Sequence, residues 1–360
     1  MSQTTENNEI PKEMKRLVVT SPGEGKSVAD CTIVTEIVPT PVPASGEVLV
    51  KVVASPINPS DYGSWHRSKP ESYPMLIGKE GSGIVVASGG GLTTRRCPIG
   101  SPVGFIMDGG KQGSYSEYVS LNATTHVFLM PTDTPIEDCA SFFVNPYTAV
   151  GIIDTARKEG SNKAIVHTAA ASQLGQMLNK LALTEEIEII NVVRREEQAD
   201  LLREIGAKHI VVTGSSGDDE SEAKWKNELK DKINDLGATC AFDAVAGRMA
   251  GALMDCMPQK GTVYVYGGLS GPVENISPMD LIYRKKQLKG FLLTTWIFSG
   301  GPLLTLPRLI SAGRKVNSGL TAPGWSSTQF SDTSIEDAHD NIVQLLGSSI
   351  TGKKLRIRFN

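Results

Sequence analysis

The 360-residue sequence predicts an α/β protein in which a doubly wound, parallel-sheet domain is joined to a barrel-like, mostly β domain. Two observations predict this fold class. From Lys163 onward, short β-type runs alternate with helical patterns, as in βαβ units. Before Tyr147, short β-type runs alternate with Gly- and Pro-rich turns and helical patterns are few, as in small barrels. The length also suits two domains better than one.

The barrel-like domain is expected to comprise residues 12–147 and 298–360, because the chain returns to loops, a helix and a strand at its end. Residues 148–297 form the expected doubly wound domain, and residues 1–11 a flexible tail. The patterns predict barrel strands at Lys15–Val19, Glu47–Ala54, Gly83–Ala87, Tyr115–Val119 and Lys354–Phe359, and a late helix at Glu336–Leu346.

The doubly wound domain is expected to start with a helix and then to alternate strands with helices. The predicted helices are Tyr147–Thr155, Leu174–Leu181, Gln198–Ile205, one within residues 214–236 and one ending at Met257. The predicted strands are Ala164–Val166, Ile187–Val193, His209–Val212, Cys240–Val245, Thr262–Tyr266 and Leu288–Thr294.

Composition excludes several classes of protein. Hydrophobic residues make up 40% and charged residues 21%, which is ordinary for a globular chain. A net charge of −3 gives no indication of a nucleic-acid partner or of an anionic membrane surface. No apolar run approaches the length of a membrane span.

The compartment is predicted to be reducing. The five cysteines are scattered, with no CxxC pair and no metal-ligand cluster, as expected of reduced thiols in a cytosol-like environment. Residues 1–12 lack the apolar core of a secretory signal and carry two acids. We therefore expect a cytoplasmic protein, with a mitochondrial or other organelle matrix left open if a transit peptide has been removed.

The segment from Lys163 to Arg195 has the strand–turn–helix–strand order of a Rossmann dinucleotide-binding unit. Its turn, Ala169–Ser172, is built of small residues, and only Gly175 remains of the usual glycines. The first N–H groups of a helix lack intrahelical partners and attract anions, so a pyrophosphate is expected at this turn. The alternative is an ordinary crossover without a ligand.

The second strand of this unit ends in Arg194 and Arg195. An NAD site usually has an acidic residue there, which bonds the ribose 2′-hydroxyl. An acid would repel a 2′-phosphate, whereas two guanidinium groups bind one. The pair therefore favours NADPH as the cofactor; the alternative is that both arginines only face solvent.

Several spaced motifs make the whole chain resemble the medium-chain dehydrogenase/reductase superfamily. Gly100–Val103 (GSPV) stands where that family usually has GDRV, and Gly113–Val119 (GSYSEYV) is similar to its GGYAEYV strand. Asn145–Ala149 (NPYTA) matches the start of its TA-containing helix. The resemblance implies a barrel-like catalytic domain, a Rossmann domain and a C-terminal return to the first domain.

Within this superfamily the chain looks most like the zinc-free quinone reductases and 2-enoyl thioester reductases. Ser55–Asp61 (SPINPSD) is close to the enoyl reductases' PINPSD. Four other segments resemble the same group: His167–Gly175, Asn191–Arg194, Tyr266–Gly268 and Leu288–Trp296.

The positions that match zinc ligands carry Asn58 and Lys79 in this chain. An amide is a poor zinc ligand, and an ammonium group has no lone pair to donate. The four-cysteine structural zinc lobe is also absent from the sequence. We therefore expect no metal, so that developing negative charge must be stabilised by hydrogen bonds or by a proton donor.

The resemblance also implies a set of cofactor-binding residues. The phosphate turn and helix start would contact the pyrophosphate, the arginines the 2′-phosphate, and the later residues the nicotinamide side. Carried over position by position, the set is Asn58, Asn145, Thr148, Ala171, Ser172, Gln173, Leu174, Gly175, Arg194, Arg195, Tyr266, Gly267, Gly268, Phe291, Leu292, Leu293 and Lys353.

The resemblance to the enoyl thioester reductases implies that the proton donor is a tyrosine shortly after the PSD helix, but this chain is about two residues shorter there than those enzymes. Tyr73 is the candidate and Tyr62 the runner-up; a barrel-surface tyrosine is the alternative for either. Lys79 is expected either to point into the same cleft or to be a solvated surface lysine.

The predicted function is NADPH-dependent transfer of hydride to an activated C=C of an enoyl thioester or another α,β-unsaturated carbonyl. A quinone or carbonyl oxidoreductase is the first alternative, and an NADPH-binding protein without significant turnover is the second. The resemblance implies a homodimer, with Leu288–Thr294 as an edge-like run. A small-molecule substrate is expected, with neither a nucleic-acid nor a membrane partner.

Overall fold

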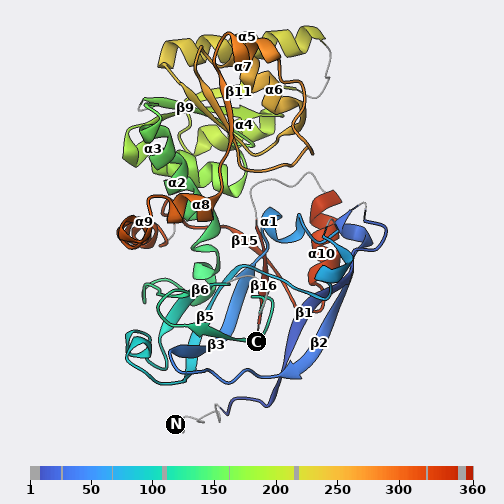
Figure 1. Ribbon diagram of the computed structural model, residues 1–360, viewed down its shortest axis with the longest axis vertical. Helices are drawn as coiled ribbons and strands as arrows, with labels where there is room; N and C mark the ends of the chain where they lie inside the picture. The colour runs from blue at the N-terminus through green and yellow to red at the C-terminus, as the bar shows by residue number, and fades with distance from the viewer. Residues whose placement is uncertain are drawn as a thin grey trace. The chain divides into compact units, whose positions relative to one another are not determined.

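The computed structural model describes residues 9–25, 27–66, 68–107, 112–161, 163–214, 219–321, 323–347 and 354–359. The chain divides into two compact units, Met1–Phe143 with Ser327–Asn360, and Val144–Ser326 (Figure 1). The sequence placed the return to the barrel-like unit earlier, at residue 298. The difference arises because helix α9 (Pro302–Ser318) packs against α2 (Val144–Lys158) and α8 (Leu293–Phe298) of the second unit. Residues 1–8 of the expected tail lie outside the described residues.

The first unit is mostly β. Its strands are β1 (Glu13–Ser21), β2 (Thr32–Pro39), β3 (Glu47–Pro56), β4 (Met75–Leu76), β5 (Glu80–Ser88), β6 (Pro102–Ile106), β7 (Tyr118–Asn122), β8 (Val127–Leu129), β15 (Phe330–Thr333) and β16 (Lys354–Arg358). Its helices are α1 (Pro59–Tyr62) and α10 (Ala338–Gly347), with 3₁₀ turns η1 (Val28–Asp30), η2 (Pro70–Ser72), η3 (Thr93–Arg96) and η4 (Ile136–Ser141).

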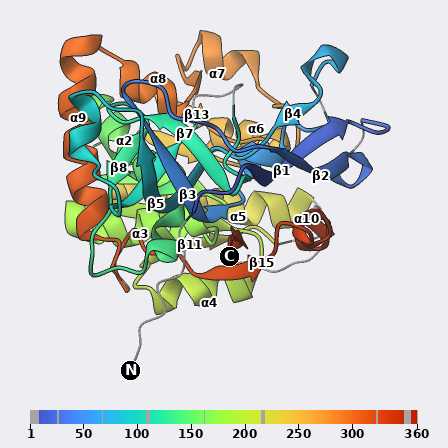
Figure 2. The ribbon, with the colours of Figure 1, turned by 90° about the horizontal axis from the view of Figure 1, so that it is seen from below.

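Two sheets make up this unit. One has the strand order β2-β1-β4, and β1 and β2 form its long antiparallel ribbon (Figure 2). The other has the order β15-β16-β3-β5-β6-β8, with β7 also paired to β3. The C-terminal strand β16 joins the sheet antiparallel to β3, with Ile357 opposite Ser55. The end of the chain is thereby part of the same sheet as its first hundred residues.

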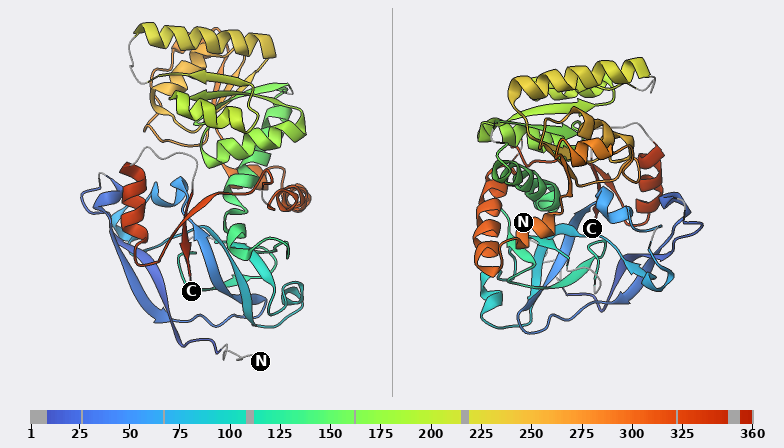
Figure 3. Two further views of the ribbon diagram at one scale, coloured as in Figure 1. Left: turned by 180° about the vertical axis from the view of Figure 1, so that it is seen from behind. Right: turned by 45° about the horizontal axis from the view of Figure 1, so that its top comes forward.

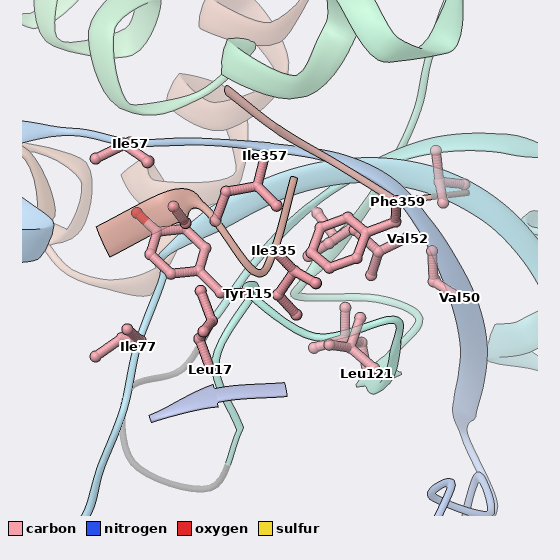
Figure 4. Close-up of a cluster of buried hydrophobic side chains, with 14 of the residues drawn as sticks. Leu17, Val50, Val52, Ile57, Ile77, Tyr115, Leu121, Ile335, Ile357 and Phe359 are labelled. Atoms are coloured by element: carbon pink, nitrogen blue, oxygen red, sulfur yellow. The ribbon is translucent and has the colours of Figure 1, made fainter. Parts of the chain in front are cut away.

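The core of this unit lies between these strands. Alternate residues of β3, Val50 and Val52, are fully buried, as expected for strands with one face in the core. Ile357 and Phe359 from the C-terminus pack into the same cluster, together with Tyr115 (Figure 4). Burial of these apolar side chains is the main stabilising term for the unit.

The second unit contains a six-stranded, wholly parallel sheet in the order β11-β10-β9-β12-β13-β14. The strands are β9 (Ala164–Thr168), β10 (Glu188–Val193), β11 (His209–Val212), β12 (Cys240–Asp243), β13 (Thr262–Val265) and β14 (Gln287–Gly290). Besides α2, α8 and α9, its helices are α3 (Gln173–Glu185), α4 (Glu196–Glu204), α5 (Asp219–Leu236), α6 (Gly247–Cys256) and α7 (Pro278–Ile282).

Helices cover both faces of this sheet (Figure 3). Trp225 and Leu229 of α5 and Leu253 of α6 share one apolar cluster with sheet residues, whereas Leu202 of α4 belongs to another cluster together with Val193 of β10. The strand order runs outward from β9 in one direction and from β12 in the other. The topological switch point, where ligands bind in such sheets, is therefore between β9 and β12.

The predicted fold class, a doubly wound domain plus a mostly β domain, is confirmed. Two predicted strands are displaced. The run predicted at Tyr115–Val119 forms a strand at Tyr118–Asn122, because Tyr115 turns into the core. The run predicted at Leu288–Thr294 ends at Gly290, and Leu293 begins α8, whose Trp296 and Ile297 are buried.

No helix in the described part of the chain is long and apolar enough to cross a membrane.

Candidate functional site

The turn after β9 is shaped by its small residues. Ala169 has a positive φ of 49°, and the chain then enters α3 at Ser172, whose hydroxyl accepts a hydrogen bond from the Gly175 N–H at 3.2 Å. This N-cap satisfies one of the first N–H groups of the helix. The predicted residues Ala171, Gln173 and Leu174 lie in the same turn, at the carboxyl edge of the sheet.

Gly175 is the one glycine that this turn requires. A Cβ at this position would lie 2.5 Å from the carbonyl carbon of Ala170 and closer still to its oxygen. These obstacles are backbone atoms, which cannot rotate away as a side chain can. The helix therefore approaches the turn too closely for any residue larger than glycine.

The two arginines that follow β10 differ in their surroundings. Arg194 is exposed, and its side chain makes no ion pair with any residue that the structure describes. Arg195 is the N-cap residue of α4, and its guanidinium lies 3.9 Å from the carboxylate of Glu197. The Gln198 side chain accepts hydrogen bonds from the backbone N–H of both arginines, at 3.0 and 3.2 Å. Arg194 is thus the guanidinium available to an anion.

A side-chain bridge ties the two strands of the switch point together. Thr168, the last residue of β9, donates a hydrogen bond of 2.6 Å to the Asp243 carboxylate at the end of β12. The Asp243 carboxylate also accepts from the N–H groups of Val245 and Ala246 at 2.9 and 3.0 Å. Burial raises the pKa of Asp243, and these hydrogen bonds oppose that shift. The bridge fixes both strand ends.

A second side-chain bridge, between His167 and Tyr266, lies at the same carboxyl edge of the sheet. The Nε2 atom of His167 lies 2.7 Å from the hydroxyl oxygen of Tyr266, which follows β13, and the two rings are stacked. His167 is fully buried, and burial lowers its pKa to about 3, so the imidazole is neutral. Sequence reasoning missed His167 and Asp243; a polar residue near the carboxyl end of an apolar strand was the available signal.

The remaining predicted residues of this unit also follow strand ends. Gly267 and Gly268 come after β13, and a Cβ on Gly267 would lie 2.7 Å from the Ala244 carbonyl oxygen. After β14, Phe291 is buried with its ring edge-on to Phe242, whereas Leu292 is exposed and Leu293 begins α8.

Two predicted residues come from the first turns of α2, and one cannot be placed. The Thr148 hydroxyl donates to the Val144 carbonyl at 2.6 Å, and Asn145 is half-buried. Lys353 lies outside the described residues.

In the first unit, Asn58 begins α1 at the centre of a buried polar network. Its side-chain amide donates to Glu80 at 3.0 Å, and its backbone N–H donates to Asp61 at 2.7 Å. The Tyr115 hydroxyl donates to the same Asp61 oxygen at 3.1 Å. Burial raises the pKa of the Asp61 carboxyl to about 6, while the Lys79 ammonium opposes this shift.

Glu80 connects this network to the end of the chain. Its second oxygen accepts from the Phe143 N–H at 3.0 Å, and the ammonium of Lys354 lies 3.9 Å from its first oxygen. Lys354 donates to the Ser141 hydroxyl at 2.6 Å, and burial lowers the pKa of its ammonium. The charges of the buried acids Asp61 and Glu80 are therefore compensated by N–H donors, by the Tyr115 hydroxyl and by the buried ammonium of Lys354.

The two candidate tyrosines differ in the use of their hydroxyl protons. Tyr73 donates to the Trp65 carbonyl oxygen. The Tyr62 hydroxyl makes no hydrogen bond within the described residues, and burial beside Asp61 raises its pKa to about 12. Lys79 is exposed, and its ammonium donates to the Ser60 carbonyl. Which of these groups acts on a substrate stays a prediction.

The described residues include no group of three or more His, Cys, Asp or Glu side chains arranged to hold a metal ion. All five cysteines are buried free thiols. Asn58 directs its amide N–H at the Glu80 carboxylate, and Lys79 directs its ammonium at the Ser60 carbonyl, so both side chains act as hydrogen-bond donors.

Comparison with known proteins gives the class of these units. Residues 44–132 match the family model "Alcohol dehydrogenase GroES-like domain", and residues 174–300 match "Zinc-binding dehydrogenase". The mitochondrial enoyl-acyl-carrier-protein reductase of Bos taurus is 28% identical over 298 residues, which is 79% of this chain and 75% of the relative. Prostaglandin reductase-3 of Mus musculus is 27% identical over 300 residues, or 79% of this chain and 74% of that protein.

Solved structures share the same architecture. A candidate NADPH:quinone reductase of Mesorhizobium loti aligns with a TM-score of 0.80 and 27% identity, covering 98% of this chain and 100% of its own. The quinone oxidoreductase of Escherichia coli, solved with NADPH, aligns with a TM-score of 0.77, covering 96% of this chain and 100% of its own. Its identity is 20%, so this second likeness concerns the fold alone.

The two units thus define an oxidoreductase fold with a nucleotide-binding sheet and a GroES-like unit. The chain belongs to the medium-chain dehydrogenase/reductase superfamily, in its quinone reductase and enoyl reductase branch. The predicted family is confirmed.

Proposed function

We propose that the chain is an NADPH-dependent, zinc-independent reductase that transfers hydride to the activated C=C of an enoyl thioester or another α,β-unsaturated carbonyl. The observation that carries this proposal is the pairing of two features at neighbouring strand ends. The capped helix start at Ser172 follows β9, and the exposed guanidinium of Arg194 follows β10. One suits a pyrophosphate and the other a 2′-phosphate.

The residues present fit such a cofactor. The turn before α3 contains no acidic side chain, and α3 has 13 residues, enough for a full helix dipole at its N-terminus. Arg203 of α4 is already paired with Glu196 and Asp200 at 2.7 and 2.6 Å, whereas Arg194 makes no ion pair among the described residues. This difference selects Arg194 as the principal ligand of the 2′-phosphate.

A nicotinamide bound here would supply the hydride. The chain's own residues would bind and orient the dinucleotide: the start of α3 would hold the pyrophosphate, Arg194 would hold the 2′-phosphate, and residues 266–268 and 291–293 would line the nicotinamide side. The relatives named as enoyl-acyl-carrier-protein reductases support an enoyl thioester as the acceptor.

The proton for the acceptor comes from a tyrosine of the first unit. Tyr73 was the first candidate on sequence, but its hydroxyl proton is engaged by the Trp65 carbonyl. Tyr62 is the better donor because its hydroxyl makes no hydrogen bond among the described residues. A raised pKa keeps this phenol protonated until the developing negative charge on the substrate draws the proton away.

Zinc independence rests on the residues in place of ligands. Asn58 and Lys79 are both engaged as donors, as described above. Activity that is unchanged after exhaustive chelation, with less than one equivalent of zinc by elemental analysis, supports this part of the proposal. Loss of activity restored only by added zinc contradicts it.

The deciding experiment is an acceptor screen with NADPH and NADH in parallel. We expect NADPH oxidation with a crotonyl thioester and weaker oxidation with simple quinones. A screen in which only quinones are reduced would move the chain to the quinone reductase alternative, which the 27% identical Mesorhizobium loti structure supports. Binding of NADPH without turnover of any acceptor would favour the non-catalytic alternative.

The assembly and the compartment are finer proposals. The edge strand β14 is paired only with β13 in the described chain, and Leu288 on it is partly exposed, which supports a homodimer through this edge. Light scattering at micromolar concentration tests it, and a monomer contradicts it. Five free thiols support the cytoplasm or an organelle matrix, which fluorescence of a C-terminal fusion distinguishes.

A further inference from the structure

The starting point is the pair formed by the buried His167 and the half-buried Tyr266. His167 lies on β9 and Tyr266 just beyond β13, and β12 runs between these two strands. Their contact, 2.7 Å between Nε2 and the hydroxyl oxygen, spans the carboxyl edge of the sheet above β12. The pair therefore lies at the topological switch point, on the side of β12 and β13.

The direction of this hydrogen bond follows from the other ring nitrogen. The Nδ1 atom of His167 is buried and has no hydrogen-bond partner among the described residues. If Nδ1 carried the proton, a buried N–H would be left without an acceptor, which is rarer in proteins than an unpaired lone pair. Placing the proton on Nε2 avoids this, and His167 then donates to the Tyr266 oxygen.

Donation by His167 leaves the proton of Tyr266 unused within the pair. A phenol that accepts a hydrogen bond is also a better donor through its own proton, because the two bonds polarise each other. Burial raises the pKa of Tyr266, so this proton stays on the oxygen at any physiological pH. The hydroxyl is a fixed donor at the ligand edge of the sheet.

The sheet order decides which part of a dinucleotide this donor meets. Arg194 follows β10, which lies on the other side of β9, so a 2′-phosphate there places the adenosine half over β9 and β10. The other half of the cofactor must then extend over β12 and β13.

Resting on the proposed function, we propose that the Tyr266 hydroxyl donates a hydrogen bond to an oxygen of the nicotinamide-riboside half of the bound cofactor, and that His167 is the positioning residue that directs it. The imidazole touches no ligand itself. It fixes the phenol so that its proton faces outward.

Two ligands separate the halves of the cofactor. NADPH contains both halves, whereas 2′,5′-ADP contains only the adenosine side with its 2′-phosphate. We expect Tyr266→Phe to raise the Kd for NADPH by about three- to tenfold, the usual effect of one neutral hydrogen bond, and to leave the Kd for 2′,5′-ADP unchanged. Intrinsic NADPH fluorescence and calorimetry give these constants.

A matched control is available on β13 itself. Tyr264 is two residues before Tyr266, on the same face of the sheet, and its hydroxyl donates to Glu159 at 2.6 Å. Tyr264→Phe removes a tyrosine hydroxyl that plays no part in the site. We expect it to leave both dissociation constants unchanged.

The positioning role is tested at His167. His167→Leu should weaken NADPH binding as Tyr266→Phe does, whereas His167→Gln, whose amide N–H can still donate, should restore most of the affinity. In the Tyr266→Phe background His167→Leu should have no further effect, because the two residues act through one hydrogen bond. Rescue by glutamine is an outcome that a merely structural histidine would not give.

Three results would overturn the proposal. The first is a Tyr266→Phe variant that binds NADPH as tightly as a wild type that binds NADPH. This result would leave the proposed function intact. The second is equal weakening of NADPH and 2′,5′-ADP, which would place the hydroxyl elsewhere. The third is a wild type that binds neither ligand, and it overturns the proposed function as well. If His167→Leu fails to fold, the Tyr266→Phe and His167→Gln results still decide the matter.

Discussion

Substitution of Gly175 by alanine tests the geometry of the phosphate turn. The added Cβ would lie 2.5 Å from the Ala170 carbonyl carbon and 2.7 Å from its Cα, distances that non-bonded carbon atoms do not adopt. Because these neighbours are backbone atoms, either the turn or the start of α3 must move. Overpacking usually costs about 1–3 kcal/mol, and a backbone obstacle places this case at the upper end, about 3 kcal/mol.

A shift of the turn should also affect the ligand. The first N–H groups of α3 are aimed by the same backbone that the new Cβ displaces. Loss of one charge-assisted hydrogen bond costs about 1.5–3 kcal/mol, so we expect the Kd for NADPH to rise by at least about tenfold. Urea unfolding followed by far-UV circular dichroism gives the stability, and NADPH fluorescence titration gives the affinity.

Gly290 provides the matched control. It ends β14 in the same unit, its backbone does not have a positive φ, and a Cβ there would meet nothing within 4 Å. Gly290→Ala should therefore change the unfolding free energy by no more than about 0.5 kcal/mol. An equal effect of the two substitutions, or a Gly175→Ala protein with wild-type stability and affinity, would refute the reasoning.

Three further predictions concern charge and backbone strain. Arg194→Ala should raise the KM for NADPH by about tenfold and leave the KM for NADH unchanged. Arg203→Ala removes an arginine already paired with acids and should leave both KM values unchanged. Steady-state kinetics with the two cofactors checks this, and equal effects of Arg194→Ala on both cofactors would contradict the 2′-phosphate role. Burial raises the pKa of Asp61 from 3.8 to about 6, so between these two values the native state binds a proton that the unfolded chain does not. Relative to Asp61→Asn, the wild type should therefore gain about 2 kcal/mol of unfolding free energy as the pH falls from 7 to 4. Urea unfolding of both proteins across that pH range checks the sign, and a pH-independent difference would contradict it. Ala246 has φ 57° and ψ −141°, a backbone region that favours glycine. Ala246→Gly should therefore relieve strain and raise the unfolding free energy by about 1 kcal/mol. A urea midpoint below that of the wild type would show that no strain is relieved.

The alternation of apolar runs and helical patterns was enough to predict the doubly wound unit, because each strand of a parallel sheet is buried on both faces. Strand ends were harder to predict. Leu288–Thr294 is rich in apolar and β-branched residues, yet Trp296 donates from its indole to Asp154 at 2.7 Å and draws residues from Leu293 onward into a helix. That contact joins residues 142 positions apart, so no local pattern contains it.

The same limit applies to the site. The turn, the arginines and the glycines after β13 are local features, and the sequence predicted them as a set. The His167–Tyr266 bridge joins residues 99 positions apart, and its existence depends on the order of the strands rather than on either segment. Pattern analysis therefore missed His167, whose role depends on this distant partner, although Tyr266 itself was in the predicted set.

The buried network of the first unit shows how its surroundings compensate the charge of one buried acid, Glu80. Each oxygen of Glu80 already accepts a hydrogen bond, one from the Asn58 amide and the other from the Phe143 N–H, and Lys354 lies 3.9 Å away. Buried carboxylates remain tolerable only when such donors compensate their charge. These donors and the lysine, all from the first unit, compensate the charge of the Glu80 carboxylate. Lys354 lies on the C-terminal strand β16, which pairs with β3 of the same unit. The return of the chain to the first unit therefore contributes a compensating charge as well as apolar packing.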